Sequence, residues 1–342
     1  MHSSSDPSAV PVDAPPPPLP ATAAAAAPRP GPGQGPGPTR RATRRAAPLG
    51  LGLALVSAVA FGGSGTAAKP LIEAGLSSAH TVWLRVTGAA LVLLPVAWRH
   101  RDAVLRRPGV LLGFGLLAVA GVQACYFAAI SRIPVGVALL IEYLGPPLLI
   151  AYVRLVQRRP VSRRATAGAG VAVAGLACVV EVWNGLSFDA LGVLFALGAA
   201  CCQVGYFVLA DAGRQGERPV DPLAVSAYGL LIGAVLLTAF TRPWDADWSL
   251  LGRSVAMNGH QVPALLPALW MVLVATVLAY LTGVASVQHL SPPVAGVVAN
   301  LEAVVATVLA WILLGEHLGT PQLAGGALVL AGAFAAQSAA RS

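Results

Sequence analysis

Three ionisable side chains lie deep within long apolar segments of this sequence. Arg85 lies within residues 79–98, Glu142 within 133–153 and Glu302 within 291–314. An ionised group in such surroundings costs several kcal/mol unless it is paired or, for a carboxylate, protonated. Because one arginine neutralises only one glutamate, we expect Arg85 to pair with one of them and the other to be a candidate for proton coupling. Arg85 could also bind a substrate carboxylate, and the alternative to both roles is a permanent network that only locks the segments together.

A glycine and two prolines follow Glu142 within about one helical turn. Each proline removes a backbone donor, so Gly145, Pro146 and Pro147 predict a kinked or broken helix with free carbonyls beside the carboxylate. Irregular backbone at membrane depth is tolerated where it lines a cavity. Glu302 stands in an unbroken alanine- and valine-rich stretch. Glu142 is therefore the predicted proton- or substrate-linked carboxylate; a kink used only for packing is the alternative.

Other polar side chains in the apolar segments could supply hydrogen bonds to a substrate. They are Tyr126, Tyr143 and Asn300, together with Gln123, Gln203, Tyr206 and Tyr280. Taken singly, each of these side chains more often makes a hydrogen bond between helices than a contact with a ligand.

The composition predicts that the bilayer surrounds the elements that carry these groups. The chain of 342 residues is 56% hydrophobic and 11% charged, whereas a soluble domain carries about 25% charged residues. Its apolar blocks have the length of about 20 residues that crosses the hydrocarbon core. Helices are predicted at 49–68, 79–98, 109–130, 133–153, 166–183, 188–210, 222–241, 263–287, 291–314 and 320–338. Residues 1–47 hold twelve of the 28 prolines and predict a disordered cytoplasmic tail.

Basic residues between the predicted helices indicate the orientation. With a cytoplasmic N-terminus, 17 basic residues fall in inside segments and four in outside segments. Cytoplasmic segments of membrane proteins carry the excess of arginine and lysine. Both termini are therefore predicted to lie in the cytoplasm, with the long segment 242–261 outside.

The two halves of the chain align with each other. A shift of 160 residues places Gly136 on Gly296 and Glu142 on Glu302, and a shift of 157 places 167–175 on 324–332. Residues 49–183 and 188–338 are thus predicted repeats of five helices each. An odd number of spans inverts the second copy in the membrane, an arrangement typical of alternating-access transporters. The predicted fold is an all-α membrane protein with ten transmembrane helices in two inverted repeats.

The stretch Ser291 to Gly332, with its small-residue helix, "LLGE" ending and following Q-x-x-G-G run, resembles the closing helices of EamA-type members of the drug/metabolite transporter superfamily. "WLRVTGAALVLLP" around Arg85 and "IPVGVALLIEYLGP" around Glu142 are similar to the threonine/homoserine exporter branch. Ala303 departs from the proline that many relatives carry there. The resemblance implies a secondary transporter of the bacterial cytoplasmic membrane that exports small amino acids such as threonine or homoserine. Export of aromatic or drug-like compounds is the alternative.

Ser64 suggests a function from another class. Gly62 to Gly65 matches the GxSG of intramembrane serine hydrolases, but these need a histidine base, and the six histidines all lie in the tail, in loops or at helix ends. We therefore expect no enzyme, and also no metal or cofactor, because the chain has no nucleotide-binding, HExxH or CxxC pattern. The expected partners are a small-molecule substrate, protons and the lipid bilayer. Nucleic acid is not expected, and a homodimer is left open.

Overall fold

The computed structural model describes residues 38–181, 188–214, 221–287, 289 and 292–339. The chain divides into two units, Met1–Ala42 and Thr43–Ser342. The second unit contains all the described helices and strands apart from the beginning of the first helix. Residues 1–37 of the predicted tail lie outside the described part.

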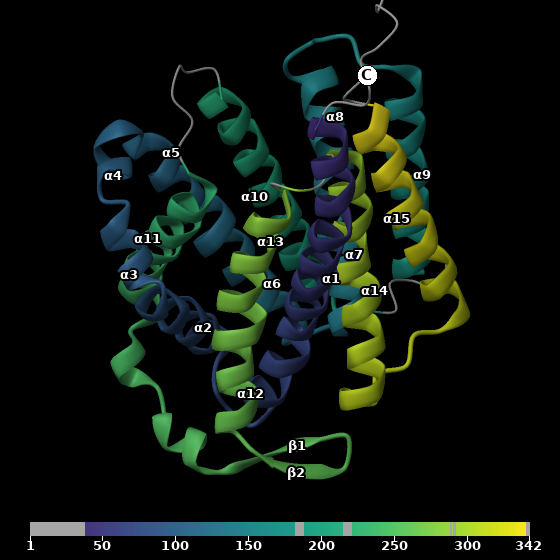
Figure 1. Ribbon diagram of the computed structural model, residues 1–342. Coiled ribbons are helices and arrows are strands. Elements are labelled where there is room, and N and C mark those ends of the chain that lie inside the picture. The colour runs from purple at the N-terminus through teal and green to yellow at the C-terminus, as the bar shows by residue number, and fades with distance from the viewer. Residues whose placement is uncertain (1–37, 182–187, 215–220, 288, 290–291, 340–342) are drawn as a thin grey trace, which may run out of the picture. The chain divides into compact units, whose positions relative to one another are not determined.

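Helices make up most of the described chain (Figure 1). In the first half they are α1 (Pro38–Glu73), α2 (Ser78–Val92), α3 (Leu94–Arg99), α4 (Asp102–Arg106), α5 (Pro108–Gly113), η1 (Phe114–Gly121), α6 (Val122–Ile130), α7 (Val135–Glu142), α8 (Gly145–Leu155) and α9 (Arg163–Val180). In the second half they are α10 (Ala190–Arg214), α11 (Pro222–Thr241), the short η3 (Pro243–Asp245) and η4 (Trp248–Gly252), α12 (Leu265–Leu269), η5 (Trp270–Leu278), α13 (Ala279–Val287), α14 (Pro292–Leu314) and α15 (Thr320–Ala339).

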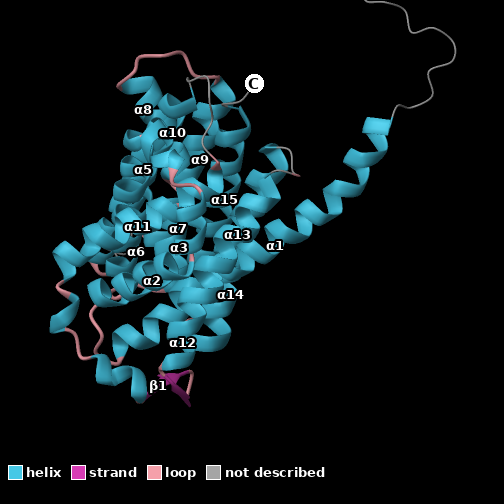
Figure 2. Cartoon of the chain, turned by 60° about the vertical axis from the view of Figure 1, so that its left-hand side comes forward, coloured by secondary structure: helices cyan, strands magenta, loops and turns pink. Residues whose placement is uncertain are grey.

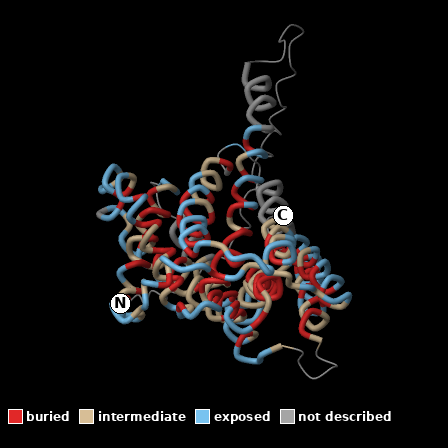
Figure 3. The backbone as a smooth tube through the Cα atoms, turned by 90° about the horizontal axis from the view of Figure 1, so that it is seen from below, coloured by how far each residue is buried: buried red, intermediate tan, exposed pale blue. Residues whose placement is uncertain are grey.

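Among the described residues, six helical stretches are long and apolar enough to cross a membrane. Three shorter apolar helices accompany them: Ala190–Tyr206, Asn300–Leu314 and Thr320–Ala336. Buried residues gather where helices meet, and exposed residues lie on the outer sides (Figure 3). Many of the exposed residues have large apolar side chains. An apolar exterior of this kind is suited to lipid rather than water. The chain is therefore a multi-pass membrane protein.

Several predicted helices differ in detail from those in the structure. α1 begins at Pro38, well before residue 49, because seven of the eight residues 40–47 are arginines or alanines, which favour helix. The second predicted helix breaks at Leu93, where Pro95 lacks the N–H that would continue the helical ladder. Two segments, η1 and η5, are π-helical inside longer helices, a feature that is frequent at functional sites.

A β-hairpin that was not predicted from the sequence lies between α11 and α12. Strands β1 (Ser254–Met257) and β2 (His260–Pro263) pair in antiparallel register, and they are the two strands of the described chain (Figure 2). Asn258 and Gly259 both have positive φ at the turn, and an Asn-Gly pair of this kind is the preferred two-residue hairpin turn. The hairpin lies at the end of the bundle opposite to the C-terminal end of α15 (Figure 1).

Helices α9 and α15 pack together through glycines on both sides. A Cβ atom added to Gly175 would lie 2.7 Å from the Gly325 oxygen and 2.7 Å from the Val329 nitrogen, so the two backbones are in close approach. The reciprocal contacts of Gly325 with the Gly175 oxygen and the Val179 nitrogen match those of Gly168 with the Gly332 oxygen and the Ala336 nitrogen under the 157-residue shift. The contacts therefore repeat about a local two-fold relation between antiparallel helices.

Gly175→Ala is expected to destabilise the folded protein by about 1–3 kcal/mol, because the added methyl group overpacks a backbone contact that cannot move away. Gly170→Ala on the same helix is the matched control, since nothing lies within 4 Å of its added Cβ atom, and it should leave stability unchanged or raise it by up to about 1 kcal/mol. Unfolding of the purified variants in detergent measures both effects. Equal stability of the two variants would contradict the close approach.

Candidate functional site

Arg85 is the most deeply buried charged group in the described chain, with 2% of its surface exposed. Its Nε donates a hydrogen bond to Thr276 Oγ1 at 2.8 Å, and its Nη1 donates one to Gln123 Oε1 at 2.7 Å. Its Nη2 donates a third to the Ala275 carbonyl at 3.2 Å. The guanidinium carbon also lies 5.6 Å from the centre of the Phe127 ring, a favourable cation–π geometry. Arg85 thus joins α2 to α6 and η5 through neutral partners.

The π-helical turn of η5 shapes this acceptor set. Thr276 Oγ1 donates to the Met271 carbonyl at 2.8 Å, which orients its lone pairs toward Arg85. Gly88 brings α2 close to η5, since a Cβ atom there would lie 2.9 Å from the Val272 side chain. Thr276 is not among the predicted site residues, because a threonine in an apolar segment carries no distinctive signal.

The expected ion pair between Arg85 and a glutamate is not present as a direct contact. Among the described residues, Arg85 forms no ion pair within 4 Å. Its charge nevertheless attracts both Glu142 and Glu302 over a longer distance. Three of its five N–H groups instead donate to Gln123, Thr276 and the Ala275 carbonyl.

Glu142 is the last residue of α7, and the helix is interrupted directly after it. Tyr143 and Leu144 form the connecting turn, and α8 begins at Gly145. Since Pro146 and Pro147 have no N–H, the carbonyls of Glu142 and Tyr143 lack their ordinary helical donors. Gly145 also leaves the space that the Gln203 side chain of α10 fills. The carboxylate of Glu142 therefore lies at a break in the helix.

Glu302 lies in the continuous helix α14, and its hydrogen-bond partner comes from the interruption between α7 and α8. The Tyr143 hydroxyl donates a hydrogen bond to its carboxylate. Gly62 of α1 packs directly on α14, because a Cβ atom there would lie 2.9 Å from the Glu302 carbonyl oxygen. The charges of Glu142 and Glu302 repel each other, so the two glutamates that align between the halves of the sequence lie close enough for their charges to interact. Both side chains are half-buried, as is that of Tyr143.

The remaining predicted residues divide into two groups. Tyr126, which is 5% exposed, and Tyr280 lie close enough to Arg85 to interact with its charge, and the Tyr126 hydroxyl contacts Gly65 of α1. Asn300 lies two residues before Glu302, which places it on a different face of α14. Its Oδ1 atom is buried and accepts no hydrogen bond from the described residues.

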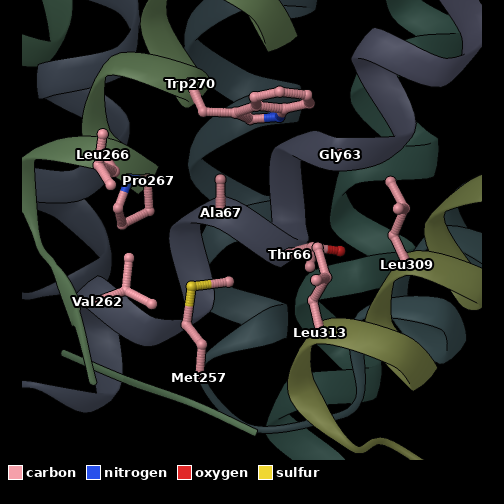
Figure 4. A pocket seen from close by; sticks show the side chains of 10 residues that line it. All are labelled: Gly63, Thr66, Ala67, Met257, Val262, Leu266, Pro267, Trp270, Leu309 and Leu313. Carbon is pink, nitrogen blue, oxygen red and sulfur yellow. The ribbon is translucent and has the colours of Figure 1, made fainter. Parts of the chain in front are cut away.

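A separate cavity of about 240 Å³ lies between α1, the hairpin, α12, η5 and α14 (Figure 4). Its walls are almost wholly apolar and include Met257, Val262, Trp270 and Leu309. None of the predicted site residues lines it. The charged cluster and this cavity are therefore different places in the fold.

Ser64 lacks the surroundings that a nucleophile requires. Its side chain is 4% exposed, and its hydroxyl has no hydrogen-bond partner among the described residues. A serine hydrolase needs a base within hydrogen-bond reach of that hydroxyl. Gly63 and Gly65, its neighbours, serve instead to bring α1 close to Trp270 and Tyr126.

The chain is similar in sequence to proteins that are named as transporters. The chain is 26% identical to the threonine/homoserine exporter RhtA of Escherichia coli strain K12, over 81% of this chain and 88% of that protein. It is 24% identical to the uncharacterized transporter YwfM of Bacillus subtilis, over 84% of this chain and 93% of that protein. A solved structure with a TM-score of 0.51 and 21% identity covers 87% of this chain and 98% of its own, and supports the fold.

The profile of the EamA-like transporter family matches the chain twice, at residues 48–181 and 190–336. These matches and the transporter relatives overturn the hydrolase alternative at Ser64. Because the matches cover most of the sequence, the protein belongs to the EamA-like transporter family and is a membrane transporter, not an enzyme.

Proposed function

We propose that the protein exports small amino acids such as threonine or homoserine across the bacterial cytoplasmic membrane. The observation that carries this proposal is the mixed charge of the interior, where Arg85 has no direct acidic partner among the described residues and Glu142 and Glu302 lie nearby. An amino acid carries one carboxylate and one ammonium group, so its two ends complement the arginine and the glutamates. The name of the Escherichia coli relative supports the same substrate class.

The donors of Arg85 allow such a ligand to bind. A guanidinium has five N–H groups, and the three hydrogen bonds to Thr276, Gln123 and Ala275 use three of them. The other two are left for a substrate carboxylate. Because Arg85 is almost fully buried, the substrate reaches it only when neighbouring helices part, as alternating access requires.

The proposed architecture is ten spanning helices in two inverted repeats. Three observations support it: the family profile matches each half, Glu142 and Glu302 align and interact, and α9 and α15 make reciprocal contacts under the 157-residue shift. Inverted repeats provide two related states in which the site opens to one side and then to the other. We further propose that protons drive export through one glutamate.

Uptake of radiolabelled threonine and homoserine into inverted membrane vesicles tests the proposal. Vesicles with the protein should accumulate one of these amino acids, and a proton gradient of the correct sign should increase the rate. No uptake above control vesicles for any amino acid, with folded protein present, would overturn the substrate class.

The apolar cavity favours a second candidate function, the export of aromatic or drug-like compounds. Its apolar walls and the ring of Trp270 suit a flat apolar ligand. Including an aromatic cation in the same vesicle assay separates the two functions. Accumulation of that cation without any amino acid would favour this candidate.

Both termini are proposed to lie in the cytoplasm, with Ser249 outside. In a variant whose four cysteines are replaced by alanine, Ser249→Cys should react with a membrane-impermeant maleimide in cells with a permeabilised outer barrier, since the side chain is exposed and the basic residues gather at the opposite side. Asp102→Cys, exposed in the connection between α3 and α5, is the control and should react only after lysis. The reverse pattern would invert the orientation.

A further inference from the structure

We propose that Lys69, Glu316 and the backbone N–H of Val135 form a gate that closes the hairpin end of the transporter, and that opening this end requires the gate to break. This hairpin-end gate rests on the proposed alternating access, but it involves none of the residues assigned to the substrate. Nothing in the mixed-charge site requires an ion pair at this end of the bundle.

An ion pair links the end of α1 to the segment that follows α14. Lys69 Nζ lies 2.5 Å from Glu316 Oε1, and the two side chains are only 16% and 13% exposed. The other ion pairs of the described residues have side chains that are at least 30% exposed. Partial shielding from water strengthens the attraction between Lys69 and Glu316 and raises the cost of separating them.

The second oxygen of the same carboxylate holds a third element. Glu316 Oε2 accepts a hydrogen bond of 2.9 Å from the backbone N–H of Val135, the first residue of α7. The first N–H groups of a helix have no partner within the helix, and a carboxylate there also interacts favourably with the helix dipole. Glu316 thus ties α1 and α7 of the first half to the α14–α15 connection of the second half. Parting the halves at this end must break both contacts.

The hairpin holds this connection in place. Asn258 Nδ2, at the hairpin turn, donates a hydrogen bond of 2.9 Å to the carbonyl of Ile312, one of the last carbonyls of α14. Gly315 follows with a φ of +68° and lies against Asn258. This left-handed residue ends the helix and turns the chain so that Glu316 faces Lys69. The hairpin therefore helps to hold the Glu316 carboxylate in its position beside Lys69.

At the opposite end, the positions that correspond to Glu316 form no ion pair among the described residues, and the ion pair that joins the halves there, His100–Asp221, is more exposed. Shifts of 160 and 157 residues place Val156 and Arg159 at the position of Glu316. Residues 154–160 are all exposed, and none of them forms an ion pair within the described part of the chain. The two repeats thus differ at this position, and only the repeat at the hairpin end has the gate contacts of Glu316 among the described residues.

Accessibility of a cysteine below the gate tests the proposal in the full chain. Thr307 is half-buried on α14, between Glu302 and Glu316, and lies against Gly136 of α7. Thr307→Cys is introduced into a variant whose four cysteines are replaced by alanine. A membrane-impermeant maleimide is then added from the hairpin side, and its rate of reaction with this cysteine is measured. Lys69→Met and Glu316→Gln should each raise the labelling rate about tenfold, because either one shifts the population toward the open state.

Two controls separate the gate from a general loosening of the fold. Lys69→Arg keeps the charge and should label at close to the parent rate, while Ser254→Cys on the exposed strand β1 should label equally in every background. The double variant of Lys69→Met and Glu316→Gln should label no faster than the faster single variant, since both changes remove one interaction.

Parent-like labelling in a folded Lys69→Met protein, or equal labelling of the Met and Arg variants, would overturn the gate. The readout needs no substrate, so it stands apart from the vesicle assay. If no amino acid is transported but the gate variants label faster than the parent, only the substrate proposal is wrong. If amino acids are exported but the gate variants label at the parent rate, only the gate proposal is wrong.

Discussion

Glu142→Gln is expected to remove the pH dependence of export while leaving folded protein in the membrane. Glu142 stands at the interruption between α7 and α8, just before Gly145, Pro146 and Pro147. Water and substrate reach such an opened helix more readily than a closed one. A carboxylate there can exchange its proton between the two states of the cycle, whereas glutamine cannot. Proton-driven export should fall by about 10- to 100-fold, the equivalent of one lost charged hydrogen bond.

Glu302→Gln is the matched comparison and should act chiefly on stability. Its carboxylate accepts the Tyr143 hydrogen bond and lies in a continuous helix packed on Gly62, so it has a fixed structural partner. Losing the charge should lower the free energy of unfolding by about 1–3 kcal/mol. Transport measured against pH, together with the amount of folded protein, distinguishes the two variants. Export by Glu142→Gln with its full pH response would move proton coupling to another residue.

Arg85→Ala is expected to have the largest effect on folding. The change removes three hydrogen bonds and leaves Gln123 and the Ala275 carbonyl without their donor. An unsatisfied buried polar group costs about 1–3 kcal/mol, and the two glutamates lose the positive charge that offsets their repulsion. The free energy of unfolding should fall by at least about 3 kcal/mol.

Two further variants separate the geometry of Arg85 from its charge. Arg85→Lys retains the charge but cannot reach three diverging acceptors, so it should recover folding only in part. Adding Glu302→Gln to Arg85→Ala removes one of the repelling carboxylates and should also restore some folded protein. Yields of folded protein from gel filtration and thermal unfolding measure both effects. Full recovery by lysine would show that charge alone matters at this position.

The positions of the helices, and which charged residues lie within them, were largely predictable from the sequence. Each of the ten predicted segments is helical in the described residues, because apolar blocks of this length have few other solutions in a bilayer. The proline pair after Glu142 predicted an interruption, and the α7–α8 boundary lies there. The Asn258-Gly259 turn was readable but was overlooked within a loop.

What the sequence alone determined is which segments are helical and which charges lie among them, since both depend on local composition. Only the tertiary structure decided the partners of those charges. Arg85 binds Thr276 and Gln123 rather than a glutamate directly, and Lys69 meets Glu316 across 247 residues of sequence. These choices follow from the helix crossings that glycines such as Gly62 and Gly88 permit. Hydrophobic periodicity carries no record of such crossings, because lipid-facing and helix-facing surfaces are both apolar.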